Sequence, residues 1–323
     1  MTFSPPWWAK SPHIQTILPL LTKVDIPVLV RQRQELDDGD FIDLDWQGEA
    51  VNGNPILVLV HGLEGSALSH YARRLLHVCR LQQLVTVVHH HRSCSGEPNR
   101  LARSYHSGDT QDLQWTLSYL KQTYPASPLL VVGYSLGGNV VCKYQGEYGD
   151  NSLIERAVVI SAPLQLAACA KRLEKGFSKV YQSYLIKQLQ QKLIGKINHP
   201  TLGQQMPVKQ PQAEQLKTFY EFDHNVTAPL HGFKGVDDYY QRASGLPYLR
   251  TITKPTLVMH AQDDPFMTQD VIPHKEHLSP MVEYELHAYG GHVGFIEGGS
   301  PWRPKYYLER RIMQFLLAHT SME

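Results

Sequence analysis

A serine enclosed by glycines is the first feature of the sequence that could do chemistry. Residues 133–138 read Gly-Tyr-Ser-Leu-Gly-Gly and overlap the end of the apolar run Leu129 to Tyr134. In this G-x-S-x-G pattern the serine occupies a sharp turn between a strand and a helix, and the glycines let the two elements approach closely. Because such a turn exposes the hydroxyl, the pattern predicts that Ser135 is a nucleophile.

A serine hydroxyl needs a base to remove its proton and a third group to orient that base. The apolar run Thr256 to His260 is followed by Asp263 and Asp264, and a later glycine-rich segment carries His292. The order serine, acid, histidine therefore predicts His292 as the base and Asp264 as the acid. Either carboxylate could reach the imidazole. Asp264, the last Asp of its turn, suits the acid position better, and Asp263 is the alternative.

The tetrahedral intermediate of acyl transfer carries an oxyanion, which needs fixed backbone NH donors. One donor is predicted at Leu136, the first residue of the helix after the serine. The second is predicted at Leu63, because residues 61–66 read His-Gly-Leu-Glu-Gly-Ser directly after the apolar run Ile56 to Val60. Taken alone, this segment would be interpreted as a plain glycine turn.

Histidine is abundant, with 17 residues, and His89, His90 and His91 stand in a row. Consecutive residues of a strand point to alternate faces, and no carboxylate or cysteine is spaced to complete a zinc site with them. A serine triad needs no ion. We therefore expect no metal and no other cofactor.

The pattern of apolar runs predicts the elements that position these residues. Eight strands are expected, at Val28 to Glu35, Phe41 to Trp46, Ile56 to Val60, Leu84 to Val88, Leu129 to Tyr134, Ala157 to Ser161, Thr256 to His260 and Val282 to Leu286. Helices are expected near Tyr71 to Leu81, near Asp109 to Lys121, from Leu136, and near Lys305 to Ala318. This alternation predicts an α/β fold with a mostly parallel sheet and helices on both faces. The turn Asp38-Gly39 predicts that the first two strands pair antiparallel.

Residues 164–254 contain no convincing strand. Tyr181, Leu185, Leu189 and Leu193 recur every four residues, and Tyr184 and Ile194 widen the stripe, as in an amphipathic helix. A structureless loop of this length is uncommon in a compact domain, so we expect a helical cap over the carboxyl edge of the sheet. The predicted domains are a core of residues 1–163 and 255–323 and a cap of residues 164–254. A helical insertion with no role over the site is the alternative.

Composition excludes several classes of partner. Lys and Arg total 31 against 30 Asp and Glu, so no basic field attracts nucleic acid. The four cysteines, Cys79, Cys94, Cys142 and Cys169, show no CxxC spacing and are too few for a stapled secreted scaffold, which favours the cytoplasm. Neither a signal peptide nor an apolar span of about 20 residues is evident. Trp7 and Trp8 could contact a membrane transiently, but an N-terminal arm packed on the domain is the preferred interpretation.

The chain as a whole resembles the α/β-hydrolase superfamily, and within it the YheT-like bacterial hydrolases and their eukaryotic α/β-hydrolase-domain relatives. The segments that carry the resemblance are HIQT at 13–16, DGDFIDLDW at 38–46, HGLEGS at 61–66, SGEPNR at 95–100, YHSGDTQDL at 105–113, GYSLGGN at 133–139, TAPLHGF at 227–233, DDYYQRAS at 237–244, AQDDPF at 261–266 and GGHVGF at 291–296. Relatives usually have glycine where Ser93 follows Arg92, so the loop above the site is expected to differ in shape.

The resemblance implies the α/β-hydrolase fold, a triad of Ser135, Asp264 and His292, and esterase or lipase-like activity on short- to medium-chain carboxylic esters, some of them lipid-derived. The sequence thus predicts a serine hydrolase of small ester substrates that works through an acyl-enzyme on Ser135. Two alternatives stay open. An acyltransferase would deliver the acyl group to an alcohol, as a drier site would favour, and a binding protein would keep the fold without turnover.

Overall fold

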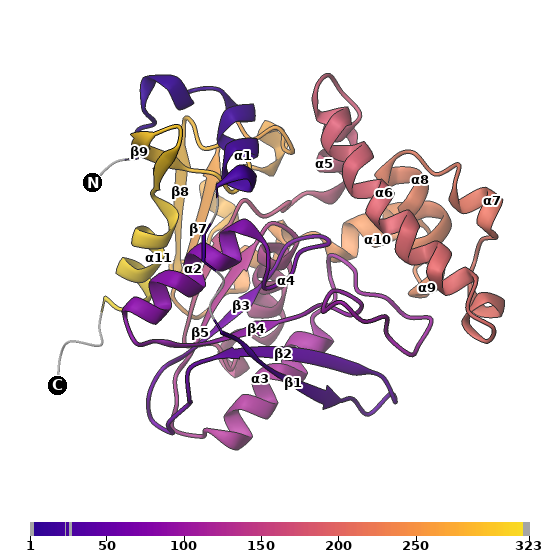
Figure 1. The fold of residues 1–323 in the computed structure, drawn as a ribbon, viewed down its shortest axis with the longest axis horizontal. Coiled ribbons are helices and arrows are strands. Elements are labelled where there is room, and N and C mark those ends of the chain that lie inside the picture. The colour runs from indigo at the N-terminus through magenta and orange to yellow at the C-terminus, as the bar shows by residue number, and fades with distance from the viewer. Residues whose placement is uncertain (1–2, 23, 26–27, 319–323) are drawn as a thin grey trace.

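An eight-stranded sheet lies at the centre of the computed structural model, which describes residues 3–22, 24–25 and 28–318 (Figure 1). The strands are β1 Val30–Glu35, β2 Phe41–Gln47, β3 Ile56–Val60, β4 Val85–His89, β5 Leu129–Tyr134, β6 Arg156–Ile160, β7 Thr256–Ala261 and β8 Val282–His287. Their order in the sheet is β1-β2-β4-β3-β5-β6-β7-β8. β2 pairs antiparallel with β1 and β4, and the other neighbours pair in parallel. The predicted fold class and the eight predicted strands are confirmed, with ends that differ by one or two residues.

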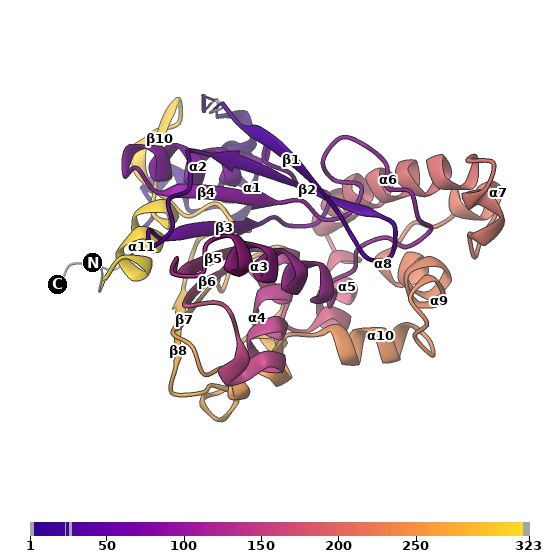
Figure 2. The ribbon, with the colours of Figure 1, turned by 90° about the horizontal axis from the view of Figure 1, so that it is seen from below.

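Alternate residues of the central strands enter two separate cores, as the period of a strand requires. Val58 of β3 packs in a cluster with helices α3 Gln111–Thr123 and α4 Leu136–Tyr148. Its neighbour Leu57 packs in a second cluster with α2 His70–Leu81 and α11 Leu308–Leu316. The sheet is therefore covered on both faces, and Figure 2 shows these helices on its two sides.

The N-terminal segment packs against the end of the chain. It contains the 3₁₀ turn η1 Trp7–Ala9 and helix α1 Pro12–Leu21. The side-chain amide of Gln15 accepts the NH of Ile296 at 2.6 Å and donates to Ile296 O at 3.2 Å. Ile296 begins a two-stranded ribbon of β9 Ile296–Ser300 and β10 Arg303–Tyr306.

This ribbon was not predicted, and the expected helix from Lys305 to Ala318 was wrong at its start. Lys305 and Tyr306 pair with β9, and α11 begins only at Leu308. The segment of β9 contains two consecutive glycines and one β-branched residue, so it lacks the composition by which a strand is recognised.

Residues 164–254 form helices and turns with no strand (Figure 1). The helices are α5 Leu166–Leu173, α6 Ser178–Ile197, α7 Gln210–Ala213, α8 Phe219–Phe222, α9 Ala228–Leu230 and α10 Val236–Ala243. Three further turns are η3 Leu202–Gln205, the π-helical η4 Asp223–Thr227 and η5 Leu246–Thr251. The predicted amphipathic helix is α6. Its stripe was wrong at Tyr184, which is 67% exposed.

Candidate active site

Ser135 lies between β5 and α4 in a left-handed backbone conformation, with φ at +51° and ψ at −120°. This conformation is strained for a residue with a side chain and is typical of functional turns. A Cβ on Gly133 would lie 2.7 Å from Gly137 O, and one on Gly137 would lie 2.3 Å from Val60 O. Only glycine therefore lets β5, α4 and β3 meet at this point.

Three side chains form a continuous series of hydrogen bonds beginning at this serine. His292 Nε2 lies 2.9 Å from Ser135 Oγ, and His292 Nδ1 lies 2.9 Å from Asp264 Oδ2. The other oxygen of Asp264 accepts the NH of Phe266 at 2.8 Å. The Asp264 side chain is fully buried. The arrangement can remove a proton from the serine and stabilise the imidazolium that results.

The neighbouring carboxylate, Asp263, has a different environment. Its Oδ1 accepts the NH of Gly291 at 2.9 Å, and its Oδ2 is buried with no hydrogen-bond partner. Burial raises the pKa of Asp263 to about 6. The structure thus brings Asp264 to the imidazole and Asp263 to the backbone of the histidine loop.

Helix α1 supports the histidine loop, a contact that sequence reasoning missed. Thr16 Oγ1 accepts the NH of His292 at 3.0 Å and donates to Pro12 O at 2.7 Å. A Cβ on Gly291 would lie 2.6 Å from Pro12 O, so the loop and the helix touch backbone to backbone. On its other side the imidazole stacks on Phe266, with ring centroids 4.0 Å apart. The only sign of this contact in the sequence was the segment HIQT at 13–16, which contains Thr16 and was noted for its resemblance to the family, with no chemical role assigned to it.

The two residues predicted as oxyanion donors line one apolar cavity with Ser135. In the described part of the chain, neither the NH of Leu63 nor that of Leu136 has a hydrogen-bond acceptor. The backbone NH groups of the two neighbours of Leu63 do have acceptors: Gly62 NH donates to Tyr71 OH and Glu64 NH donates to Tyr105 OH, each at 2.9 Å. Leu63 is thus left with a free donor in a loop fixed on both sides.

The apolar cavity lies between the serine and helices α5 and α6. Its apolar walls include Pro163, Leu166, Cys169, Ala170, Leu173, Leu185, Phe266 and Met267, and the empty space, part of it open to solvent, is about 590 Å³. A second, open cleft also reaches Ser135 and His292, and its walls come from α1, from residues 62–69 with the start of α2, and from α6. One side of Ser135 therefore faces mainly apolar side chains, and the other faces a cleft with both polar and apolar walls.

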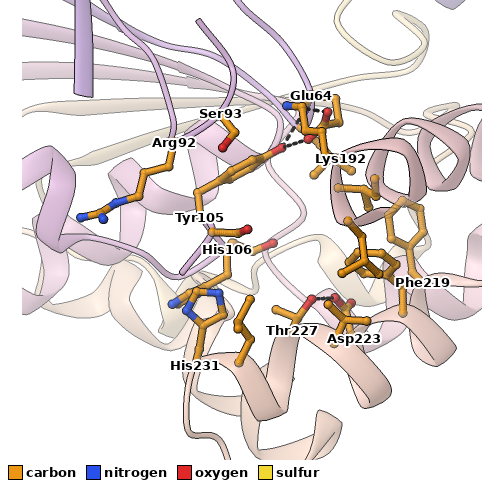
Figure 3. A pocket seen from close by; sticks show the side chains of 18 of the residues that line it. Glu64, Arg92, Ser93, Tyr105, His106, Lys192, Phe219, Asp223, Thr227 and His231 are labelled. Atoms are coloured by element: carbon orange, nitrogen blue, oxygen red, sulfur yellow. Dashed lines mark hydrogen bonds and ion pairs between the residues drawn. The ribbon is translucent and has the colours of Figure 1, made fainter. Parts of the chain in front are cut away.

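A third space, which we call the inner chamber, lies beneath α6 (Figure 3). It meets the apolar cavity at the residues that line both, which are Leu63, Ser107, Leu136, Phe219, Asp223 and Tyr239. Figure 3 shows Tyr105 beside Glu64 and Lys192 on one side of the chamber, and Asp223 bonded to Thr227 on another. The chamber therefore has apolar walls, and it also contains polar groups that already have hydrogen-bond or ion-pair partners.

The three consecutive histidines are buried and have separate partners. His89 Nδ1 lies 2.9 Å from Thr116 Oγ1, His90 Nε2 lies 2.8 Å from Asp45, and His91 Nε2 lies 3.0 Å from His61 O. Burial lowers the pKa of His89 to about 4 and that of His91 to about 3. Among the described residues, no three His, Cys, Asp or Glu side chains are grouped as a metal site would need.

Ser93 has a left-handed backbone, with φ at +62°. Glycine adopts this conformation without strain. The serine is supported by Asn99, whose NH donates to Ser93 Oγ at 3.1 Å. The departure from the family pattern therefore occurs at a position where the backbone favours glycine.

Comparison with known proteins places this geometry in a family. Residues 55–299 match a family model described as alpha/beta hydrolase fold. The chain is 43% identical over 310 residues to the candidate esterase YheT of Escherichia coli (strain K12), covering 95% of this chain and 90% of that protein. It is 30% identical over 329 residues to the human phospholipase ABHD3, covering 98% of this chain and 79% of that protein.

A similar fold is found in the solved structure of the Pyrococcus furiosus esterase Pf2001. The TM-score is 0.55 at 17% sequence identity, over 98% of this chain and 99% of that one. Within the described residues, every helix is too short or too polar to cross a membrane.

Proposed function

The chain belongs to the alpha/beta hydrolase family, as an ester hydrolase of esterase or lipase type, and on that premise we propose that it works through an acyl-enzyme on Ser135. The observation that carries the proposal is the hydrogen-bonded series of Ser135, His292 and Asp264, with 2.9 Å at both contacts. An exposed serine needs such a base, and the base needs an acid to fix its tautomer.

In the first half of the reaction, Ser135 Oγ attacks the ester carbonyl while His292 Nε2 takes the serine proton. Asp264 accepts from Nδ1–H and stabilises the imidazolium. The oxyanion accepts hydrogen bonds from the NH groups of Leu63 and Leu136, and these bonds become stronger as negative charge develops on the oxygen. His292 then gives its proton to the departing alcohol.

In the second half, water attacks the acyl-enzyme with His292 again as base; the bond between the acyl carbon and Ser135 Oγ then breaks, the acid leaves, and His292 returns the proton to Ser135. The open cleft that reaches Ser135 and His292 gives water a route to the acyl group. This supports hydrolysis over transfer to an alcohol, because a transferase must exclude water from its intermediate.

The apolar cavity supports acyl esters as substrates, with the chain of the acid lying between α5 and Phe266. Short- to medium-chain esters, including lipid-derived ones, are the proposed class, and the name of the relative ABHD3, a phospholipase, supports the lipid-derived part. A series of p-nitrophenyl esters of graded acyl length tests it, with an optimum expected below long-chain length.

The mechanism is tested with Ser135→Ala. The variant should lose ester turnover by about a million-fold in kcat and should not react with a fluorophosphonate probe. Ser183→Ala, an exposed serine on α6, is the control and should behave as wild type. Near-normal hydrolysis by folded Ser135→Ala would overturn the proposal.

A further inference from the structure

Six exposed apolar side chains lie on or directly beside the segments that form the open cleft, and we call them the apolar rim. They are Leu20 at 61% exposed, Leu21 at 73%, Leu68 at 55%, Phe177 at 50%, Val180 at 55% and Tyr184 at 67%. Leu20 of α1, Leu68 of the loop before α2 and Tyr184 of α6 line the cleft itself. A cluster of large apolar side chains left in water around an active-site opening is typical of a surface that binds something.

The rim is continuous across the two sides of the cleft. The ring of Phe177, next to the start of α6, lies 4.4 Å from the ring of His13 on α1. His13 Nδ1 also lies 2.9 Å from the hydroxyl of Tyr181 on α6. Figure 1 shows α1 and the corner between α5 and α6 on the same side of the molecule. A helix near the start of the chain, α1, and one from its middle, α6, thus present one face.

Positive charge is concentrated beside this rim. Residues 171–187 contain five basic side chains, Lys171, Arg172, Lys175, Lys179 and Lys187, against one acidic, Glu174, whereas the whole chain has 31 basic and 30 acidic residues. The four lysines are exposed. None of the four has an ion-pair partner among the described residues. We call these five residues the basic cluster.

We propose that the apolar rim and the basic cluster dock this protein on a lipid surface with anionic headgroups, with the open cleft facing the lipid. Apolar side chains would enter the headgroup region while the lysines contact anionic lipid, the combination by which peripheral proteins bind membranes. A second copy of the chain fits less well, because a symmetric contact would bring the same lysines together. The inference goes beyond the proposed function, since docking does not require Ser135.

Vesicle co-sedimentation tests the proposal with the full chain. Wild type should bind phosphatidylglycerol–phosphatidylcholine vesicles, and 0.5 M NaCl should weaken this binding, whereas pure phosphatidylcholine should bind poorly. The triple variant Lys171→Gln, Lys175→Gln, Lys179→Gln should bind the anionic vesicles at least about tenfold more weakly. Lys209→Gln, Lys217→Gln, Lys234→Gln removes the same charge from exposed positions elsewhere in residues 164–254 and should bind as wild type.

The rim has its own pair of variants. Val180→Ser with Leu21→Ser, neither of which lines the cleft, should weaken vesicle binding several-fold, whereas Val51→Ser with Leu81→Ser, at 59% and 65% exposed, should not. Hydrolysis of a monomeric soluble ester should stay within about twofold of wild type in all four variants, since none touches the triad.

The outcomes separate docking from catalysis. Ser135→Ala should bind vesicles like wild type, so failure of the proposed mechanism leaves the docking result intact. The proposal is overturned if wild type does not bind anionic vesicles, or if the lysine triple variant binds them as tightly as wild type. It is also overturned if the rim variants abolish a dimer seen by light scattering while vesicle binding is unchanged, because the face would then serve a second copy.

Discussion

Lys192 of α6 forms an ion pair with Glu64, the residue that follows Leu63, with 2.7 Å between Nζ and Oε2. The Glu64 side chain is only 3% exposed, whereas that of Lys192 is 35% exposed, so solvent reaches the pair from the side of the lysine. Glu64 also has a left-handed backbone, with φ at +53°, and Tyr105 OH donates to its other oxygen at 2.7 Å. A helix of residues 164–254 thus contacts the loop that carries one proposed oxyanion donor.

The first prediction concerns Tyr105, whose hydroxyl accepts Glu64 NH and donates to the Glu64 carboxylate. Tyr105→Phe removes both bonds and lets the peptide after Leu63 move. Loss of one oxyanion donor lowers kcat by about 100- to 1000-fold. Displacement of a donor is a smaller change than its loss, so Tyr105→Phe should lower kcat by about tenfold with little change in KM. Binding of a boronic acid transition-state analogue should weaken by a similar factor.

Tyr119→Phe is the control for that measurement, because its hydroxyl bonds to Gln32, which lines no cavity with Ser135. Lys192→Met should act in the same direction as Tyr105→Phe and less strongly, since both bonds from Tyr105 remain. A rise in KM at unchanged kcat would contradict a role in positioning the donor and would indicate a substrate contact instead.

The parts of the site that were predictable from sequence are those determined by local chain geometry. The glycines around Ser135 are needed because strand and helix meet there within a few residues, and the short spacing is visible in the sequence. The partners of the loops are not visible in this way. Thr16 contacts His292 across 276 positions, and Tyr105 contacts Glu64 across 41, so no local pattern links them.

The same reason accounts for segments known only by resemblance. Asn139, which ends GYSLGGN, donates to Ser107 O and Ala243 O and accepts the NH of Gly245. It therefore joins YHSGDTQDL and DDYYQRAS, two segments for which sequence reasoning offered no chemistry. Tyr184 shows the opposite error. A helical period predicts a stripe of apolar residues, but it does not reveal which of them find a partner.

The second prediction separates the two neighbouring aspartates. Asp264→Asn should lower kcat by about four orders of magnitude, because the amide no longer favours the imidazole tautomer that accepts the serine proton. Asp263→Asn should cost far less, since Asp263 contacts the NH of Gly291 and not the imidazole. Steady-state kinetics on both folded variants decides, and the reverse ranking would assign the acid to Asp263.

The third prediction concerns metal removal. The electrophilic assistance proposed here comes from backbone NH groups, and the base is an imidazole, so no step needs an ion. Dialysis against EDTA should leave ester hydrolysis within about twofold of its starting rate. If chelation removed most of the activity and zinc restored it, the buried histidines His89 to His91 would need to be examined as ligands.

The last prediction is a pH dependence of stability centred on Asp223, which accepts from Thr227 Oγ1 at 2.7 Å and from Tyr240 OH at 2.9 Å. Burial raises the pKa of Asp223 to about 6 from its usual 3.8. Between these values the folded chain keeps a proton at Asp223 that the unfolded chain releases, so the contribution of Asp223 to the free energy of unfolding falls as pH rises from about 4 to about 6.

Two pKa units correspond to roughly 3 kcal/mol. The side chain of Asp223→Asn cannot ionise, so the free energy of unfolding of this variant should rise relative to that of wild type by up to roughly 3 kcal/mol between pH 4 and pH 7. The amide also loses one of the two accepted bonds, which costs about 1 kcal/mol at every pH and leaves the slope unchanged. Urea unfolding of wild type and variant at both pH values measures the difference, and comparing them removes the contributions of other titrating carboxylates. Asp237→Asn, an exposed site on α10, is the control for the loss of a carboxylate. If the free energies of unfolding of Asp223→Asn and wild type differed by the same amount at pH 4 and pH 7, the Asp223 carboxyl would be hydrated in the folded chain and would ionise at its ordinary pKa.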